Sequence, residues 1–364
     1  MSYLCYTVIV LDNVHENVLL RMIPTMAKRV TIKDVAAQVG VSYQTVSRVI
    51  NDKGEVSPEV RTRVHAAIAA LNYRPNAIAR SMVRGRTRTL GCIAPNLTDY
   101  TFACILEGAK SEAREHGYFL LTSSAEHESE ASALCDEMLS SGRVDGLLVI
   151  NPYADGRYRC FEQLVARSAA IVYSGAQSRH LAIPSVHLDD ETGGYQATRH
   201  LIALGHQHIA MIAGPASEDC VTDRSAGYVR ALAEASLPYR AEWVAHGDWS
   251  ATAGYEAMQL LINSGIEFSA LFAQNDRMAV GAIKAARECG LAVPHNLAVV
   301  GFDDMPLASY FDPPLTTVCQ DIPEHGRQAA RLLIERVENP QAPIRQVVIP
   351  CKLVVRRSCG ANDN

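Results

Sequence analysis

The chain of 364 residues contains no run of 18 apolar residues, so no transmembrane helix is expected. It lacks the nucleophile-elbow motif G-x-S-x-G, the dinucleotide-binding motif G-x-G-x-x-G and a phosphate-binding loop. The sequence therefore gives no indication of an α/β-hydrolase, a dinucleotide-dependent enzyme or a P-loop nucleotide hydrolase. The ten cysteines include no C-x-x-C pair. We therefore expect reduced thiols in a cytoplasmic protein, with no metal site and no cofactor.

The net charge of −5 hides an uneven distribution. Residues 28–88 carry twelve Lys or Arg against four Asp or Glu, a surplus of +8, so the remaining residues sum to −13. A basic head on an acidic body predicts that one end contacts a phosphate backbone. The length predicts two or more domains, and 48% hydrophobic with 20% charged residues is typical of a soluble globular chain.

Two short helices are predicted within residues 31–50. Apolar residues at i, i+3, i+4 and i+7 from Ile32 form one face of a helix that Thr31 caps and Gly40 ends. Ser42 is expected to cap a second helix, whose outward side shows Tyr43, Gln44, Ser47 and Arg48. Amide, hydroxyl and guanidinium groups on one short helix suit base edges in the major groove. The pattern predicts a helix-turn-helix, with two ordinary amphipathic helices as the alternative.

The head resembles the lactose/galactose-repressor (LacI/GalR) family of bacterial regulators, on VTIKDVAAQVGVSYQTVSRVIN followed by VSPEVRTRVHAAIAALNYRPNAIARSM. The segments ALGHQHIAMIAGP, GDWSATAGY, FAQNDRMAVGA, VVGFDDMPLASYFDPPLTTVCQD and VIPCKLVVRRS extend the resemblance from about Val30 to Ser358. The resemblance implies an N-terminal all-α helix-turn-helix head and an α/β, two-lobed effector domain of the periplasmic-binding-protein type.

The pattern after residue 89 predicts an α/β domain without the resemblance. Short apolar strands alternate with helical segments, which is typical of parallel sheets covered on both faces. The predicted strands are 90–94, 119–122, 146–150, 170–173, 208–213, 270–273 and 297–301. Their number suits two doubly wound lobes.

The domain boundaries are predicted as follows. Residues 1–25 lie outside the pattern, as a non-native or disordered extension, with translation expected to start at Met26 or Met22. The head spans 26–74, and a hinge helix with its linker spans 75–88. The effector-binding and dimerisation domain spans 89–358, with lobe 1 at 89–187 and 319–348, lobe 2 at 188–318 and 349–358, and crossovers near 187, 318 and 348. Residues 359–364 form a tail.

The resemblance implies two sets of contacts to pseudo-palindromic, double-stranded operator DNA. The expected residues of the head are Thr31, Ser42, Tyr43, Gln44, Thr45, Ser47, Arg48 and Asn51, and those of the hinge are Asn76, Ala79, Arg80 and Met82. The family's hinge helix inserts an apolar wedge into the minor groove, where Met82 replaces the usual leucine. A flexible basic linker is the alternative for the hinge. An operator half-site like that of the lactose repressor is expected.

Polar and aromatic residues after strand ends are the candidates for a ligand site, because ligands of open α/β sheets lie beyond the carboxyl ends of the strands. Asn96 is such a candidate. The resemblance implies hydrogen bonds to the effector from Arg224, Asn275 and Asp303, and stacking on Phe102 and Trp249. The family pattern differs at three further positions of the site: Ser174, Cys220 and Arg277. Asp276 and Asp304 are expected to cap a helix and a turn.

One Arg, one Asp, one Asn and a Trp face suit a sugar or sugar derivative. We therefore expect an allosteric homodimeric repressor of carbohydrate-utilisation genes, released from its operator by a sugar-type inducer. A corepressor-dependent regulator of the purine-repressor type is the first alternative. A solute-binding receptor is the second, but it leaves residues 31–83 unexplained. No enzyme is expected, because adjacent Asp303 and Asp304 point to opposite sides of the chain, and His206 and His208 lack a third metal ligand.

Overall fold

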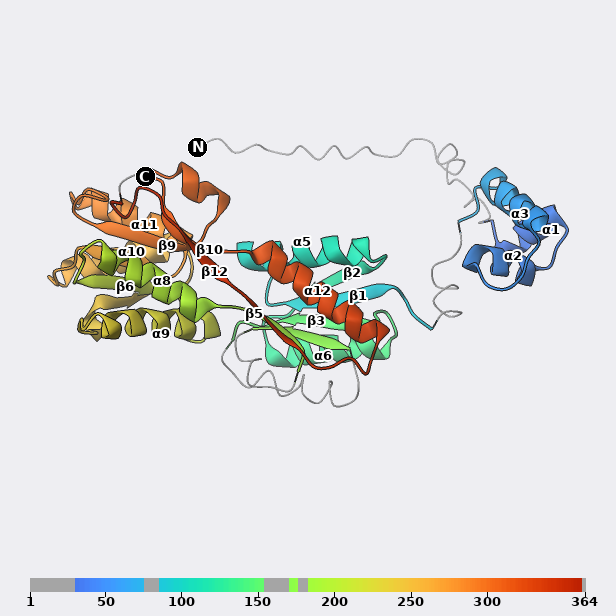
Figure 1. Cartoon of the computed structure of the whole chain (residues 1–364), viewed down its shortest axis with the longest axis horizontal. Coiled ribbons are helices and arrows are strands. Elements are labelled where there is room, and N and C mark those ends of the chain that lie inside the picture. The colour runs from blue at the N-terminus through green and yellow to red at the C-terminus, as the bar shows by residue number, and fades with distance from the viewer. Residues whose placement is uncertain (1–29, 75–84, 154–169, 176–182, 362–364) are drawn as a thin grey trace, which may run out of the picture. The chain divides into compact units, whose positions relative to one another are not determined.

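The computed structural model describes residues 30–74, 85–153, 170–175 and 183–361 (Figure 1). The chain divides into two compact units, Met1–Gly85 and Arg86–Asn364. The expected extension at 1–25 and most of the expected hinge lie outside the described residues. Within the described ranges, no helix combines the length and the apolar character that a membrane crossing needs.

Three short helices build the first unit: α1 (Ile32–Val39), α2 (Tyr43–Asn51) and α3 (Pro58–Ala70). The predicted caps are confirmed. The Asp34 carboxylate accepts hydrogen bonds of 2.7 Å from both the backbone N–H and the hydroxyl of Thr31. Gly40 ends α1 at φ 72°, and Ser42 Oγ accepts from Thr45 N at 3.1 Å. Tight turns between capped helices orient the apolar stripes toward one core, made of Val35, Ala36, Val39, Val46, Val49, Val64 and Ala67.

The second unit has two lobes, each built on a six-stranded sheet. In lobe 1 all strands are parallel, in the order β11-β5-β4-β3-β1-β2. The strands are β1 (Thr89–Ala94), β2 (Phe119–Ser124), β3 (Gly146–Ile150), β4 (Ile171–Ser174), β5 (Ser185–Leu188) and β11 (Gln346–Ile349). Helices α5 (Tyr100–Glu115) and α12 (Ile322–Glu338) pack on one face, and α6 (Glu128–Ser140) packs on the other (Figure 1).

Lobe 2 has the strand order β12-β10-β9-β8-β6-β7, in which only β12 is antiparallel to its neighbour among the described strands. The strands are β6 (Ile209–Ala213), β7 (Val244–His246), β8 (Ala270–Ala273), β9 (Ala298–Asp303), β10 (Thr316–Gln320) and β12 (Cys351–Val354). Helices α8 (Asp190–Ala203) and α9 (Asp219–Glu234) cover one face, and α10 (Ala251–Asn263) and α11 (Asp276–Glu288) cover the other.

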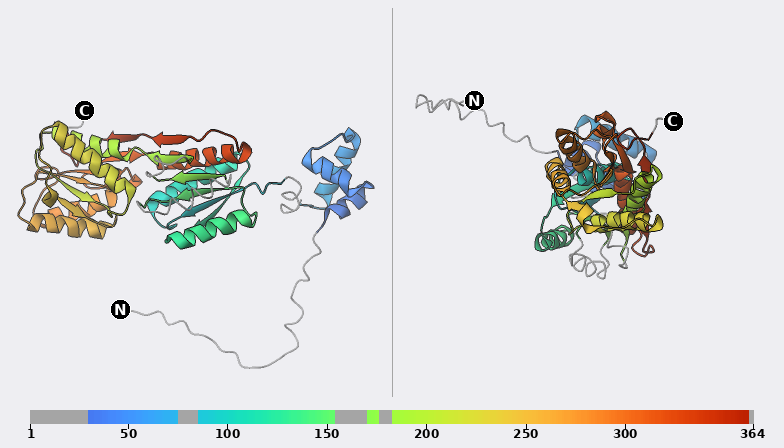
Figure 2. Two further views of the ribbon diagram at one scale, coloured as in Figure 1. Left: turned by 90° about the horizontal axis from the view of Figure 1, so that it is seen from below. Right: turned by 90° about the vertical axis from the view of Figure 1, so that its left-hand side faces the viewer.

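The chain passes between the lobes three times. It leaves lobe 1 after β5 to enter α8, returns after β10 to enter α12, and passes directly from β11 to β12. The last passage is drawn in red in Figures 1 and 2. Three short segments therefore connect the two lobes.

All seven predicted strands are present, with ends shifted by a few residues. The largest shifts are in β2 and β9, which each continue two residues beyond the predicted end, so that β9 includes Asp303. Five strands were not predicted: β5, β7, β10, β11 and β12. They are three to five residues long, and polar residues such as Ser185 and Gln320 occupy part of that length, so no long hydrophobic run marks them.

Candidate functional site

The outward side of α2 is exposed, as predicted. Tyr43 is 53% exposed, and the side chains of Gln44 and Arg48 are exposed beside it. Val46 and Val49 on the opposite side are buried in the three-helix core. The phenol, amide and guanidinium groups therefore stand together on one surface, held by a helix whose position the core determines.

The other expected DNA-contacting residues of the head have local partners. Thr31 and Ser42 cap α1 and α2, and the Ser42 and Thr45 hydroxyls lie 3.0 Å apart. Asn51 Nδ2 donates to Ser47 O at 2.9 Å and to Ser47 Oγ at 3.3 Å. These side chains stabilise α1 or α2, so any DNA contact from them comes in addition to a structural role. Asn76, Ala79, Arg80 and Met82 lie outside the described residues.

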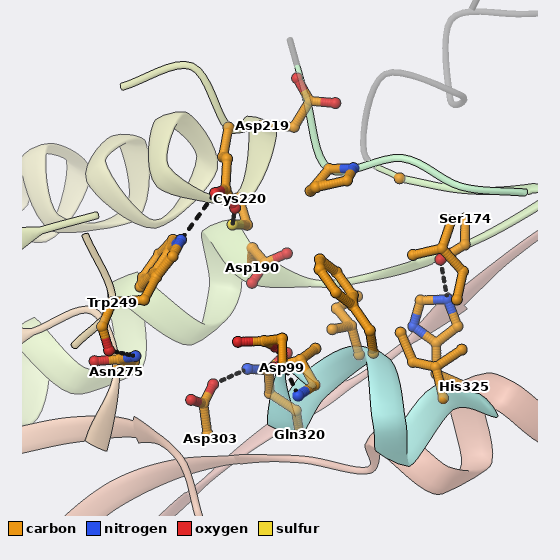
Figure 3. Close-up of a pocket in the computed structure, with 18 of the residues that line it drawn as sticks. Asp99, Ser174, Asp190, Asp219, Cys220, Trp249, Asn275, Asp303, Gln320 and His325 are labelled. Carbon is orange, nitrogen blue, oxygen red and sulfur yellow. Dashed lines mark hydrogen bonds between the residues drawn. The ribbon is translucent and has the colours of Figure 1, made fainter. Parts of the chain in front are cut away.

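A cavity of about 310 Å³ lies in the second unit, lined by residues of both lobes (Figure 3). Residues of lobe 1 reach it from the carboxyl ends of β1, β3 and β4, and residues of lobe 2 from those of β8, β9 and β10. All nine positions predicted for an effector line this pocket: Asn96, Phe102, Ser174, Cys220, Arg224, Trp249, Asn275, Arg277 and Asp303.

Arg224 is buried and held in place by two acceptors. Its Nε donates to Asp190 Oδ1 at 2.8 Å, and its Nη1 donates to the carbonyl of Gln274. Burial lowers the pKa of Arg224, but nearby negative groups, Asp190 first, outweigh that effect and raise it. The guanidinium also lies 3.8 Å from the ring centroid of Phe302. These partners hold the Arg224 side chain in place and balance its charge. The residue lies in the second turn of α9, so the prediction that it opens a helix is wrong.

Asp303 ends β9 with φ 112° and is 8% exposed. Gln320 Nε2 donates to its Oδ1 at 2.6 Å. Burial raises the pKa of Asp303 to about 8, with Arg224 and Arg277 opposing the shift and Asp276 adding to it. Asp304 turns the other way and pairs with Arg356 at 2.7 Å, which confirms that the two adjacent carboxylates face different surroundings.

The prediction that Asp276 caps the helix at Met278 is wrong. Asn275 is the cap, because its Oδ1 accepts from Met278 N at 2.8 Å. Asp276 is buried and accepts from Thr317 Oγ1 at 2.5 Å and Met305 N at 2.8 Å. Asn275 Nδ2 donates to Trp249 O at 3.0 Å, so this cap also positions the indole-bearing loop.

Several pocket residues escaped the sequence prediction. Trp249 Nε1 donates to Glu218 Oε1 at 2.9 Å, and Ser174 Oγ shares a hydrogen bond of 2.9 Å with His325 Nε2 (Figure 3). Burial lowers the pKa of His325 to about 4, so this imidazole is neutral at pH 7. Gln320 ends the unpredicted strand β10, so no predicted strand end marked it as a candidate.

Contacts between the lobes border the pocket. Arg277 Nη2 of lobe 2 lies 2.8 Å from Asp99 Oδ2 of lobe 1. The backbone N–H of Asp219 donates to Pro152 O at 2.9 Å, and Tyr153 forms an antiparallel bridge with Glu218. The lobes are thus held together by an ion pair and by backbone hydrogen bonds around the same cavity.

The described residues contain no group of three or more His, Cys, Asp or Glu arranged to hold a metal ion. His206 Nδ1 lies 2.9 Å from Ser269 Oγ, and the His208 ring lies 5.2 Å from that of Trp243. Both histidines thus have structural neighbours on the surface of lobe 2.

Two family descriptions match the two units. Residues 31–76 match "Bacterial regulatory proteins, lacI family", and residues 198–359 match "Periplasmic binding protein-like domain". A third, "Coenzyme F420 hydrogenase/dehydrogenase, beta subunit N-term", matches residues 130–188. That segment supplies only part of the lobe 1 sheet, so the similarity is local.

The chain is similar over most of its length to curated repressors. It is 36% identical over 329 residues to the HTH-type transcriptional repressor PurR of Photorhabdus laumondii subsp. laumondii, which covers 90% of this chain and 96% of the relative. It is 32% identical over 331 residues to the repressor CytR of Escherichia coli (strain K12), covering 91% and 96%.

Solved structures agree with the fold. The Lac repressor dimer bound to operator and the anti-inducer ONPF has a TM-score of 0.84 and 32% identity, over 92% of this chain and 100% of that one. The complex of the transcriptional regulator CelR with cellobiose has a TM-score of 0.68 and 32% identity, over 91% and 100%.

Proposed function

The chain belongs to the LacI family of bacterial regulatory proteins and is a DNA-binding transcriptional repressor, and from this premise we propose that a small sugar-type effector in the pocket between its lobes controls its binding to operator DNA. In this proposal a homodimer places two heads on a pseudo-palindromic operator in the cytoplasm, and the effector acts as an inducer that weakens DNA binding.

One observation carries the proposal: the nine positions expected to contact an effector line one cavity between the lobes. They come from segments as far apart as Asn96 and Asp303, so their convergence depends on the whole two-lobed fold. A cavity of about 310 Å³ with aromatic walls and a few polar groups is the usual form of a small-molecule site.

The chemistry of the lining supports a polyhydroxylated ligand. Asp303 and Gln320 offer acceptor oxygens for hydroxyl groups, and the indole of Trp249 offers an apolar face for ring C–H groups. Asp303, Gln320 and Trp249 belong to lobe 2, whereas Asn96 and Ser174 on the other side of the pocket belong to lobe 1. A ligand bound between them would therefore alter the contacts between the lobes. A change in lobe geometry is how such a ligand would reach the heads.

The proposed DNA-contacting surface is the exposed side of α2. Tyr43, Gln44 and Arg48 stand on it together, and Gln and Arg form bidentate contacts with adenine and guanine respectively. The hinge helix with its linker, expected at residues 75–88, is proposed to add phosphate and minor-groove contacts.

A repressor that needs its ligand to bind DNA is the second candidate. Its support is the 36% identity to a PurR repressor over 96% of that relative's length. The two candidates differ in sign: an inducer weakens operator binding, whereas a corepressor strengthens it.

Fluorescence anisotropy of a labelled palindromic duplex, titrated with purified protein at fixed salt, tests the proposal. The titration is repeated with sugars, sugar derivatives, purines and nucleosides. We expect tight binding, with Kd of ~10⁻⁸–10⁻¹¹ M, that one sugar-type compound weakens. Arg48→Ala should lose the preference for operator over random DNA, while its effector domain should still bind the ligand. Trp249→Leu should keep operator binding but lose the response to the ligand.

Strengthened binding by a purine or nucleoside would favour the second candidate. Binding that no small molecule alters would refute effector control while leaving the DNA-binding role intact.

A further inference from the structure

We propose that the effector carries a positively charged amino group beside its hydroxyl groups, so that the pocket prefers amine-bearing sugars to neutral or acidic ones. This inference rests on the proposed function, because it assumes that the pocket between the lobes is the effector site. It concerns the charge of the ligand, which the family resemblance leaves open.

Acidic side chains outnumber basic ones around the pocket. The carboxylic residues that line it are Asp99, Asp190, Glu218, Asp219, Asp248 and Asp303, and the arginines are Arg224 and Arg277. Both guanidinium groups already have a carboxylate partner, Asp190 at 2.8 Å for Arg224 and Asp99 at 2.8 Å for Arg277. An anionic ligand would therefore meet guanidinium groups whose charge is already balanced, and it would approach further carboxylates.

Two carboxylic side chains in the pocket have uncharged partners instead. Asp303 accepts from the Gln320 amide at 2.6 Å, and Glu218 accepts from the Trp249 indole at 2.9 Å. Among the described residues, neither has a Lys, Arg or His nitrogen within 4.0 Å. A ligand cation near these two groups would add to the positive charge of Arg224, which does not offset the desolvation of either carboxyl group.

Gln320 gives an independent indication of what the ligand must offer. This residue is 4% exposed, and its Nε2 is used by Asp303. Its Oε1 is buried and has no hydrogen-bond donor within the described part of the chain. A buried acceptor without a donor is costly, by about 1–3 kcal/mol, so a ligand that donates here gains affinity.

An ammonium group fits this arrangement because it has three donors and no acceptor. Asp303 and Gln320 are hydrogen-bonded to each other at the carboxyl ends of the adjacent strands β9 and β10. The Asp303 carboxyl group and Gln320 Oε1 therefore belong to neighbouring side chains. Phe102 and Trp249 add aromatic faces, which attract cations through their π electrons. Together they form an acceptor-rich and aromatic environment for a primary amine.

Hydroxyl groups on the same ligand are indicated by an unpartnered donor in the described lining of the pocket. Arg277 Nε is buried without an acceptor, although the charge of its guanidinium is balanced by Asp99. A ligand hydroxyl can accept from it without bringing in a negative charge. The combination of one ammonium and several hydroxyls describes an amino sugar.

The protonation of the pocket agrees with this reading. Burial raises the pKa of Asp303 to about 8 and also raises the pKa of Glu218. Both shifts arise because the surrounding positive charge is too weak to offset desolvation. A bound ammonium would favour the ionised form of both groups and so bind more tightly than a neutral hydroxyl in the same place.

The test is a fluorescence titration of the full-length Trp243→Phe protein at pH 6.5 and constant ionic strength. The chain has two tryptophans, so this variant leaves only Trp249, which lines the pocket. The probes are matched triplets: glucosamine, glucose and glucuronate, then galactosamine, galactose and galacturonate. We expect the amine of at least one triplet to bind about tenfold more tightly than its hydroxyl partner, and the acid to bind most weakly.

Variants separate charge recognition from general damage to the pocket. Glu218→Gln should reduce the ratio of amine to hydroxyl affinity, and Asp99→Asn should raise the affinity for the acid member by releasing Arg277. Glu242→Gln, which changes a carboxylate on the surface of lobe 2, is the matched control and should leave the ratios unchanged.

Equal or tighter binding of a neutral or acidic member, or no response of Trp249 to either amine, would overturn the inference. The same compounds are then added to the operator-binding assay. A neutral sugar that releases DNA would uphold the proposed function and refute the charge preference. An amine that binds the pocket without changing DNA binding would do the reverse.

Discussion

Asp99 and Arg277 form an ion pair of 2.8 Å that links lobe 1 to lobe 2 at the edge of the pocket. Asp99 also caps α5 by accepting from Thr101 N at 2.9 Å, and Arg277 lies in the first turn of α11. Each partner is thus anchored to a helix start in its own lobe. Since the side chains are 22% and 35% exposed, the pair is partly shielded from solvent, and it resists separation of the lobes.

A double-mutant cycle of Asp99→Asn and Arg277→Gln should give a favourable coupling energy of about 1 kcal/mol, at the upper end of the range for exposed pairs. The measurement is urea unfolding at low and high salt, and the coupling should decrease with salt. The surface pair Arg287–Asp312, with side chains 44% and 90% exposed, is the control and should couple more weakly. Equal coupling in both pairs would contradict the shielding argument.

Replacement of Gln44 or Arg48 by alanine should reduce discrimination at one operator base pair by about 1–3 kcal/mol while leaving binding to random DNA almost unchanged. The reason is that base contacts specify sequence, whereas phosphate contacts do not. Anisotropy titrations against single-base variants of the operator measure the effect. Lys33→Ala, on the exposed side of α1, is the comparison and should weaken all sequences alike. A uniform loss for Arg48→Ala would assign it to the phosphate backbone.

The contribution of two buried carboxyl groups, those of Asp303 and Asp276, to stability should fall as pH rises between about 4 and 8. Burial raises the pKa of Asp303 to about 8 and that of Asp276 to about 7. In this window the folded chain holds protons that the unfolded chain has released, since the unfolded pKa is about 3.9. Each group therefore stabilises the fold below pH 4, and that contribution is lost as pH rises through its folded pKa.

The unfolding free energy should decrease by at most about 1.4 kcal/mol per pH unit for each such proton. Asp303→Asn should flatten the slope, measured by urea unfolding of the full chain at a series of pH values. Asp312→Asn, which alters a surface carboxylate, should keep it. A slope that Asp303→Asn leaves unchanged would refute the assignment.

Gly281→Ala should destabilise lobe 2, because an added Cβ would lie 1.9 Å from the carbonyl oxygen of Ala251 in α10. Overpacking of this kind costs about 1–3 kcal/mol or more. Thermal unfolding measures the loss. Gly117→Asn is the control: no heavy atom lies within 4 Å of its Cβ position, and asparagine tolerates the left-handed conformation at φ 74°. If Gly281→Ala lowered the unfolding temperature no more than Gly117→Asn does, α10 and α11 would have room to separate, and the overpacking argument would be wrong.

Local patterns in the sequence were sufficient for the head and for most of the sheets. The caps at Thr31 and Ser42 and the 3.6-residue periodicity depend on neighbours within a few positions, so they are readable before folding. Uninterrupted apolar runs marked seven strands, such as β3, which is buried along its length. The short strands β5 and β10 escaped because burial against helices, rather than a hydrophobic run, places them in the sheets.

The positions of the pocket residues also followed from sequence motifs, but their chemical states did not. The sequence by itself determined that Asn275 and Asp303 stand near strand ends. Only the tertiary structure decided that Arg224 is neutralised by Asp190, that Asn275 caps α11 in place of Asp276, and that Asp99 meets Arg277 across 178 positions of sequence. Such pairings depend on how two separately packed lobes bring distant side chains together, and no local pattern encodes that geometry.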